Sequence, residues 1–207
     1  MVNRIELKEK AKESLNGKYG DAIGIVLLLF AISFIIGCAT GFLREILGLT
    51  ENSYKILTNL ASFIISGLFT FGYSSYFLKV SRDEDVEISE LWSKINLFVP
   101  YIVVSILISV FTVLWSFLFI IPGIIAALSY SMTYYVMLDH PEMDPLTAIK
   151  ESKRIMNGYK MDYFVLQLSF LGWAILGIFT FGILWLWLIP YMNVTVCNFY
   201  NHIKELS

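Results

Sequence analysis

Residues 98–138 read FVPYIVVSILISVFTVLWSFLFIIPGIIAALSYSMTYYVML and contain no charged side chain. An α-helix rises about 1.5 Å per residue, so this stretch would form about 60 Å of helix. The hydrocarbon core of a bilayer is only about 30 Å thick, so the run is long enough to cross it twice. Pro122-Gly123 is the natural break between the two crossings. We predict transmembrane helices over 98–120 and 123–138.

The composition of the whole chain is that of a membrane protein. Of its 207 residues, 57% are hydrophobic and 15% are charged, whereas a soluble domain is roughly 45–50% apolar and about 25% charged. Apolar runs of spanning length also cover 22–43, 56–80, 161–180 and 183–202. We therefore predict an all-α polytopic membrane bundle of six transmembrane helices in three hairpins, forming a single integral membrane domain over 1–207.

Two similar decapeptides lie where the chain is predicted to enter the membrane. Residues 12–21 read KESLNGKYGD and residues 153–162 read KRIMNGYKMD. In each, Asn-Gly is expected to end a surface helix. The Asp that follows five residues after the Asn, Asp21 or Asp162, is expected to cap the next transmembrane helix.

Each hairpin is predicted to follow a cytoplasmic amphipathic surface helix. The first covers 4–16 and the third covers 145–156, with Asp144 as its N-cap. A second one is expected near 92–100, where the chain has no Asn-Gly. The tetrapeptide FTFG, at 69–72 and again at 179–182, is expected to form a turn in its second copy but falls inside a helix in its first. This mismatch leaves the path of 44–66 open.

The basic residues are divided unevenly between the two sides of this layout. Of the 15 Lys and Arg residues, only Arg44 and Lys55 fall on the side away from the termini. Lys and Arg accumulate in cytoplasmic loops, so both termini and the surface helices are expected to be cytoplasmic. We predict a multi-pass protein of the plasma membrane.

The residues offer little for catalysis or for nucleic-acid binding. The two histidines, His140 and His202, lie outside the predicted spans, and neither a Ser-His-Asp arrangement nor an HExxH helix occurs. The acidic residues around His140 are interpreted as a polar loop with a helix cap rather than a metal site. We expect the protein to have no enzymatic activity, no cofactor and no bound metal. The net charge of −2 and the lack of a basic tail argue against nucleic acid as a partner.

Uncharged polar residues within the spans leave two functions open. Interhelical hydrogen bonding is the simpler interpretation and suits a scaffold, an envelope-homeostasis protein or a partner subunit, which we favour. Its partners would be the lipid bilayer and either another membrane protein or a second copy of the chain. The alternative is a transporter or binder of a lipid-like or small amphiphilic molecule, with a polar cavity among the third to sixth spans. We expect four residues to line that cavity: Gln167, Asn193, Tyr130 and Tyr134.

Three stretches of the chain resemble a known family. They are the N-terminal ELKEKAKESLNGKYGDAIG, residues 114–143 (LWSFLFIIPGIIAALSYSMTYYVMLDHPEM) and residues 148–191. Together they resemble the domain of unknown function (DUF) 975 family of bacterial integral membrane proteins. The resemblance implies a bacterial multi-pass protein, distantly akin to the membrane domain of glycerophosphodiester phosphodiesterases. It implies no agreed activity and no catalytic residues.

Overall fold

The computed structural model describes residues 2–207, apart from the side chain of Leu118. The described part is 81% helix and contains no strand. The elements are α1 (Arg4–Ser14), α2 (Tyr19–Leu47), α3 (Glu51–Ser81), α4 (Glu90–Ser93), η1 (Ile95–Leu97), α5 (Phe98–Leu118), α6 (Ile120–Tyr130), α7 (Thr133–Asp139), α8 (Pro145–Ile155), α9 (Lys160–Leu168), α10 (Leu171–Phe179) and α11 (Trp185–Glu205).

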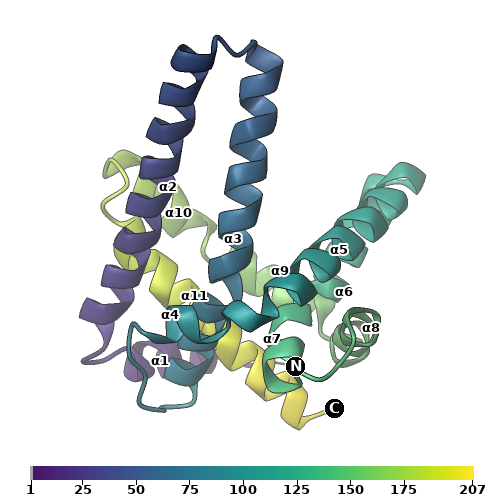
Figure 1. The fold of residues 1–207 in the computed structure, drawn as a ribbon. Coiled ribbons are helices and arrows are strands. Elements are labelled where there is room, and N and C mark those ends of the chain that lie inside the picture. Colours follow the sequence, from purple (N-terminus) through teal and green to yellow (C-terminus); the bar gives the residue numbers. More distant parts are fainter. Residues whose placement is uncertain (1) are drawn as a thin grey trace.

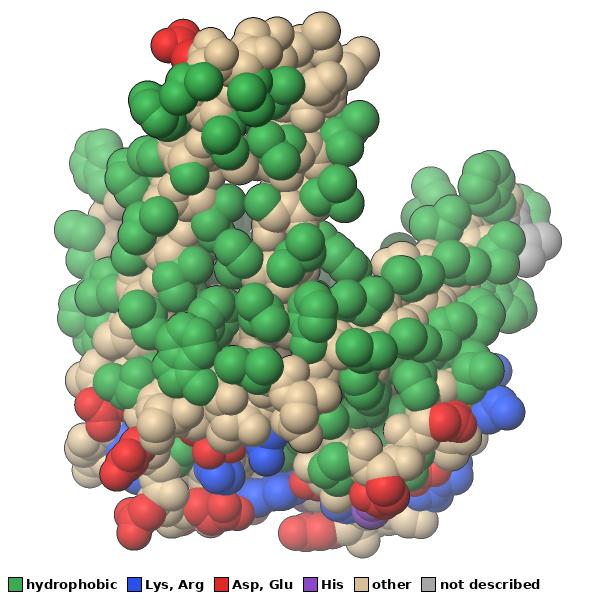
Figure 2. All heavy atoms as spheres, viewed as in Figure 1, with side chains coloured by type: hydrophobic (Ala, Val, Ile, Leu, Met, Phe, Trp, Pro, Cys, Tyr) green, Lys and Arg blue, Asp and Glu red, His purple; other side chains and the backbone are tan. Residues whose placement is uncertain are grey.

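Three helical hairpins rise from one end of the molecule (Figure 1). They are α2 with α3, α5 with α6 and α7, and α9 and α10 with α11. We call the end that carries α1, α4, α8 and both termini the base. We call the loops at 48–50, 119 and 180–184 the tips. Charged side chains gather at the base, and apolar side chains cover the hairpins above it (Figure 2).

Five segments within residues 2–207 are long and apolar enough to cross a membrane. They are Tyr19–Leu47, Glu51–Ser81, Ile95–Phe117, Ile120–Asp139 and Lys160–Phe179. The sixth predicted span, 183–202, coincides with most of α11, which is not among them. The second half of α11 is more polar because it lies inside the base, where Asn198 is buried.

Hairpin α2–α3 is longer than predicted. Residues 44–47 and 51–55 are helical, so the connection is only three residues long. Gly48 ends α2 with a left-handed φ of 56°, and the Thr50 hydroxyl caps α3 by accepting from the Ser53 amide at 3.3 Å. This places 44–66 almost entirely in the two helices and puts the first FTFG inside α3.

Two other predicted spans are each broken into two helices, at positions that no Pro or Gly marks. The predicted helix 123–138 consists of α6 and α7. Ser152 of α8 lies in the break between them, where its hydroxyl donates to the Ser129 carbonyl at 2.9 Å and accepts from the Met132 amide at 3.2 Å. The predicted helix 161–180 consists of α9 and α10.

The turn between α5 and α6 falls at Phe119, so Pro122 sits in the first turn of α6, where proline is tolerated.

The elbows that begin the first and third hairpins have the same backbone. Gly17 and Gly158 have φ of 78° and 88°, and the residue two positions before each, Leu15 or Met156, is fully buried. Because the positive φ reverses the chain within one residue, α2 begins at Tyr19 and α9 at Lys160, each two residues before the Asp of the repeat. Asp21 and Asp162 therefore do not cap these helices. They lie in the first turn, where a carboxylate still faces the positive end of the helix dipole.

The three short helices of the base each pack on the closing helix of another hairpin. Helix α4 packs on α3, α8 on α7, and α1 on α11, so the contacts run around the molecule as a ring. The apolar side of α1 is fully used in this way, with Leu7, Ala11 and Leu15 buried. The apolar side of this predicted surface helix therefore packs on protein.

The hairpins separate above the base. In four of the five candidate spans only 17–22% of the most apolar window is buried, whereas Ile120–Asp139 is 50% buried. Among the described residues, the aromatic-ring contacts and the side-chain hydrogen bond between α3 and α5 all involve Tyr101, which lies in the first turn of α5. Beyond that residue the two hairpins diverge (Figure 1). The helices thus form a bundle only in their lower part.

Candidate binding groove

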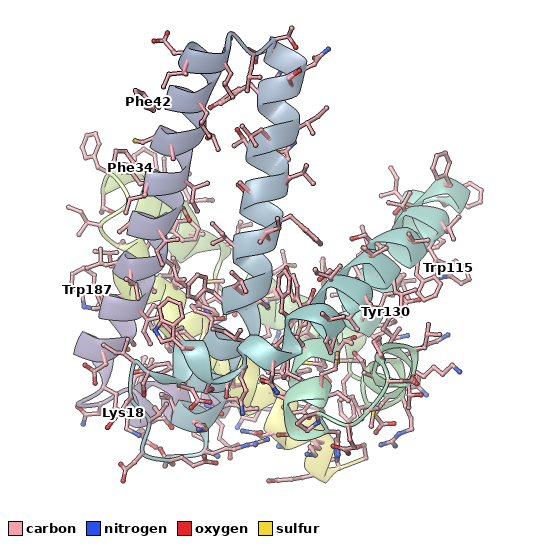
Figure 3. All side chains as sticks on the ribbon, in the orientation of Figure 1. Lys18, Phe34, Phe42, Trp115, Tyr130 and Trp187 are labelled. Atoms are coloured by element: carbon pink, nitrogen blue, oxygen red, sulfur yellow. The ribbon has the colours of Figure 1, made fainter. Side chains whose placement is uncertain are left out.

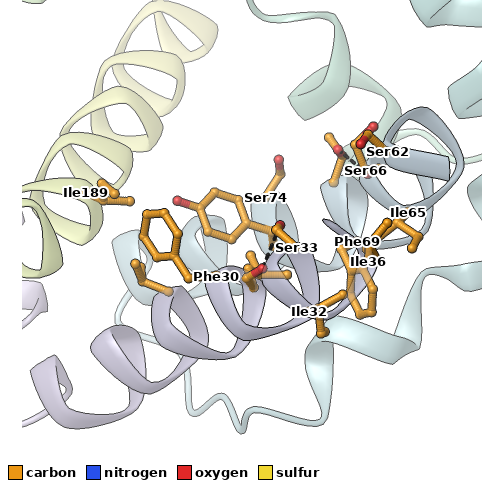
Figure 4. A pocket seen from close by; sticks show the side chains of 14 residues that line it. Phe30, Ile32, Ser33, Ile36, Ser62, Ile65, Ser66, Phe69, Ser74 and Ile189 are labelled. Atoms are coloured by element: carbon orange, nitrogen blue, oxygen red, sulfur yellow. Dashed lines mark hydrogen bonds between the residues drawn. The ribbon is translucent and has the colours of Figure 1, made fainter. Parts of the chain in front are cut away.

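A groove of about 620 Å³ lies between α2 and α3, with α11 closing one side (Figure 4). Its walls are mainly apolar, with hydroxyl groups concentrated on α3. The lining residues are Val26, Leu29, Phe30, Ile32, Ser33, Ile36, Ser62, Ile65, Ser66, Phe69, Thr70, Tyr73, Ser74 and Ile189.

The hydroxyl groups form a stripe along α3. Ser62, Ser66, Thr70 and Ser74 are spaced four residues apart, which places them on one face of a helix. Ser66 Oγ donates to the Phe63 carbonyl at 2.9 Å and lies 3.2 Å from the Tyr101 hydroxyl. Across the groove, Ser33 Oγ on α2 donates to the Leu29 carbonyl at 2.8 Å. Because a hydroxyl that donates to its own helix keeps its acceptor capacity, the stripe offers acceptors to a bound molecule.

Asn193 supports the groove from α11. Its side-chain amide donates to the Tyr73 hydroxyl at 2.7 Å and to the Ile189 carbonyl at 2.8 Å. Both of these partners line the groove. Asn193 therefore holds two lining residues in place without itself being part of the wall.

The other three predicted cavity residues lie elsewhere. The Tyr134 hydroxyl is 3.0 Å from Ser105 Oγ, and its ring stacks on Tyr101 with centroids 5.7 Å apart. Tyr130 is buried (Figure 3), and Gln167 is half-buried on α9. No hydrogen bond between described residues joins Gln167 to Asn193. The structure does not bring the four predicted residues together, because the groove opens between the first, second and sixth predicted spans rather than among the third to sixth.

A polar cluster at the base joins the ends of α3, α7 and α11. Asp139 accepts from both terminal nitrogens of Arg82 at 2.9 Å, from the Tyr200 hydroxyl at 2.9 Å and from Lys204 Nζ at 2.6 Å. Its side chain is only 10% exposed. A bidentate pair of this kind fixes both distance and orientation. The cluster therefore clamps together the closing helices of the three hairpins.

Asp144 is the N-cap of α8. One carboxylate oxygen accepts from the Thr147 amide and the other from the Thr147 hydroxyl, each at 2.8 Å. These hydrogen bonds hold the pKa of Asp144 below its usual value, and the bond from the backbone amide has the largest effect. With Asp139 in the clamp and Asp144 in a cap, both carboxylates have structural partners.

Sequence reasoning missed the residues that line the groove. It singled out polar residues in the later spans and passed over the serines of α3. The signal that would have found them is the spacing of four between Ser62, Ser66, Thr70 and Ser74, which places hydroxyls in a line rather than scattering them around a helix.

The fold and groove define a class: an all-helical protein whose described part has five helices long and apolar enough to span a membrane. A family model with the description "Protein of unknown function (DUF975)" matches residues 1–129 and 117–207, and together the two matches cover the whole chain. The protein belongs to this family. No curated protein and no solved structure matches it significantly.

Proposed function

We propose that this protein is a non-enzymatic integral membrane protein of the bacterial plasma membrane that binds a lipid-like amphiphile in the α2–α3 groove. One observation carries the proposal. The groove combines apolar walls with a stripe of hydroxyls, and it has room for a chain-like molecule.

The depth of the groove supports a lipid-like ligand. On α2 it is lined from Val26 to Ile36, which is about 15 Å of helix in the middle of the apolar stretch 22–43. A ligand at this depth lies among acyl chains. Its apolar part would contact Phe30, Ile32 and Ile36, and its polar group would hydrogen-bond to the stripe on α3.

The lining of the groove supports a binding role rather than catalysis. Its residues include no Asp, Glu, Lys, Arg, His or Cys within the described chain. General acid-base or nucleophilic catalysis usually relies on such groups. Tyr73 is the one ionisable residue in the wall, and its hydroxyl is engaged by Asn193.

The distribution of charge supports the orientation. Arg44 and Lys55 lie near the tip of hairpin α2–α3, and the remaining Lys and Arg residues lie on segments toward the base. By the positive-inside rule, this distribution favours a cytoplasmic base. Both termini lie at the base (Figure 1), which requires an even number of crossings. We therefore count α11 as the sixth span.

Native mass spectrometry of the protein, extracted gently with its own lipids, tests the binding role. The informative variant is Ser33→Phe/Ser74→Phe, which fills the groove from both walls. The matched control is Ser109→Phe, an exposed serine of α5 outside the groove. We expect a retained amphiphile at fixed stoichiometry in the wild type and the control, and at least a tenfold loss in the filled variant. Equal retention in all three would overturn the proposal.

A scaffold or partner-subunit role is the second candidate. It is favoured by the separation of hairpins α2–α3 and α5–α6, which leaves large apolar residues such as Phe117 and Ile120 exposed. In this role the same experiment would find another polypeptide, or a second copy of the chain, in place of the amphiphile.

A further inference from the structure

A second hollow, of about 400 Å³, lies between α1, the start of α2, α10 and α11. We call it the basic-aromatic pocket. Its lining residues are Lys8, Lys12, Tyr19, Trp173, Leu184, Trp187, Leu188 and Tyr191. One end is thus cationic and the other is formed by indole and leucine side chains. None of these residues lines the α2–α3 groove.

The two lysines have no acidic partner within residues 2–207. Lys8 Nζ lies 4.2 Å from the centroid of the Phe170 ring and donates to the Ser169 carbonyl at 3.4 Å. Lys12 Nζ lies 5.9 Å from the centroid of the Tyr191 ring. The neighbouring acidic residues of α1, Glu9 and Glu13, are exposed and form no ion pair with either lysine.

The environment of Lys8 shows that this positive charge is uncompensated. Burial, followed by the charges of Arg4 and Lys12, lowers the pKa of Lys8 below its usual value. Each of these causes disfavours the ammonium form. An anion bound between Lys8 and Lys12 would relieve the repulsion between them.

The rest of the pocket fits an apolar chain. From Tyr191 of α11 the lining runs back about 10 Å to Leu184, which belongs to the tip at 180–184. Trp173 and Trp187 are 54% and 48% exposed, so each presents a face to the surroundings. Trp187 is labelled in Figure 3. Trp and Tyr side chains favour the level of lipid headgroups. The pocket therefore places cations at the base and an apolar wall that leads toward a tip.

We propose that the basic-aromatic pocket binds an anionic phospholipid from the leaflet at the base. The ammonium groups of Lys8 and Lys12 donate to the phosphate oxygens, and an acyl chain lies along Trp173, Leu184 and Trp187. The apolar wall is what favours a phospholipid over a soluble anion, which would contact only the cationic end. This site is independent of the α2–α3 groove, so failure of either proposal leaves the other standing.

Quenching of tryptophan fluorescence by brominated acyl chains tests this site directly, because two of its walls are indoles. The full chain is reconstituted in phosphatidylcholine vesicles that contain increasing fractions of either brominated phosphatidylglycerol or brominated phosphatidylcholine. We expect the wild type to prefer the anionic lipid, by about fivefold for each lysine. Trp173→Phe/Trp187→Phe should remove the part of the quenching that depends on the headgroup.

Charge-matched variants separate the pocket from the general attraction of a basic surface. Lys8→Gln/Lys12→Gln should lose the preference, whereas Lys8→Arg/Lys12→Arg should keep it. The control Lys10→Gln/Lys153→Gln removes the same charge from exposed positions of α1 and α8 and should keep it as well. Equal preference in the Lys8→Gln/Lys12→Gln variant and the control would overturn the site. Equal quenching of the wild type by the two brominated lipids would overturn the assignment of its ligand as an anionic phospholipid.

Discussion

The base and the outer halves of the same helices are held together in different ways. At the base end of α3, Phe71, Tyr76 and Phe77 are at most 1% exposed, whereas Phe34 and Phe42 in the outer part of α2 are 73% and 68% exposed (Figure 3). Both groups are large and aromatic. Composition therefore identifies apolar residues without saying whether protein or lipid will cover them. The base is stabilised by protein packing, and the outer halves depend on the surroundings of the hairpins.

Polar contacts are also more buried at the base than near the tips. At the base, Asp139 and Glu90 have side chains about 10% exposed and several partners each. Near the tip of hairpin α2–α3, the Arg44–Glu51 pair is 2.8 Å long, but its side chains are 43% and 54% exposed. Ion pairs as open as this one contribute little to stability. This difference can be tested at four positions, Gly72, Asp139, Glu90 and Asn193, taken in order of decreasing cost to stability.

Gly72→Ala should have the largest effect. A Cβ at this position would overlap the backbone of Leu91 in α4, which cannot move aside as a flexible side chain would. We expect a loss of about 3 kcal/mol or failure to fold, measured by thermal unfolding in detergent. Gly37→Ala, on the outer part of α2 with nothing within 4 Å of its Cβ, should be neutral or stabilising. Similar stability of the two variants would contradict the difference in packing between the base and the outer halves.

Asp139→Ala should destabilise the protein by about 2 kcal/mol, because it leaves Arg82 and Lys204 without their shared partner. Glu51→Ala removes the carboxylate that pairs with Arg44 at the tip, and its cost should stay below about 1 kcal/mol. Chemical denaturation of both variants under one set of conditions measures the difference. A larger loss for Glu51→Ala would reverse the assigned roles of base and tips.

Glu90 should make the stability of the base depend on pH. Burial acts to raise the pKa of Glu90, but hydrogen bonds from Lys79 at 2.8 Å and Ser75 at 2.6 Å outweigh it, and the net pKa is lowered. Since the folded-state pKa lies below that of the unfolded chain, the contribution is complete above about pH 4.5. It is lost as the pH falls through the folded-state value.

The measurement for Glu90 compares the unfolding of wild type and Glu90→Gln from pH 7 to pH 3. We expect a difference of about 1 kcal/mol at pH 7 that shrinks below pH 4.5. A difference that stays constant over this range would show that the Glu90 carboxylate does not link α4 to α3 through its charge.

Asn193→Leu should have the smallest effect on stability, about 0.6 kcal/mol, which is typical of one hydrogen bond within a membrane. The substitution removes the bond that holds Tyr73 at the groove, so retention of the amphiphile should fall more than stability does. Tyr73→Phe removes the same bond from the other side and should behave alike. If both variants keep full retention, the groove does not depend on this contact.

Local signals in the sequence predicted the elements of the base well. The repeated Asn-Gly gave both elbows, and Asp144-Pro145 gave the start of α8, because each rests on the conformational preference of one or two residues. The repeat correctly indicates that Asp21 and Asp162 lie near the starts of helices, but neither residue caps its helix. Whether an Asp caps a helix depends on where the preceding glycine lets that helix begin.

Long-range features were less accessible from the sequence. The break between α6 and α7 depends on Ser152, about 20 residues further along the chain. The groove depends on the distance between α2 and α3, which the hydropathy of the sequence does not indicate. Of the predicted cavity residues, only Asn193 contacts the groove, through Tyr73. Polar character alone identified a set of buried hydrogen-bonding residues without showing which of them surround a hollow.

The hairpins are packed at the base and separate toward the tips, and this separation can be measured. Spin labels on Asn52→Cys and Phe119→Cys, in a Cys38→Ser background and in a lipid nanodisc, test it through the distance between the tips of hairpins α2–α3 and α5–α6. Both positions are exposed, and the remaining Cys197 is fully buried. We expect a separation well beyond the roughly 10 Å between the axes of packed helices. A narrow distribution of distances near that spacing would instead show that the hairpins form a closed bundle.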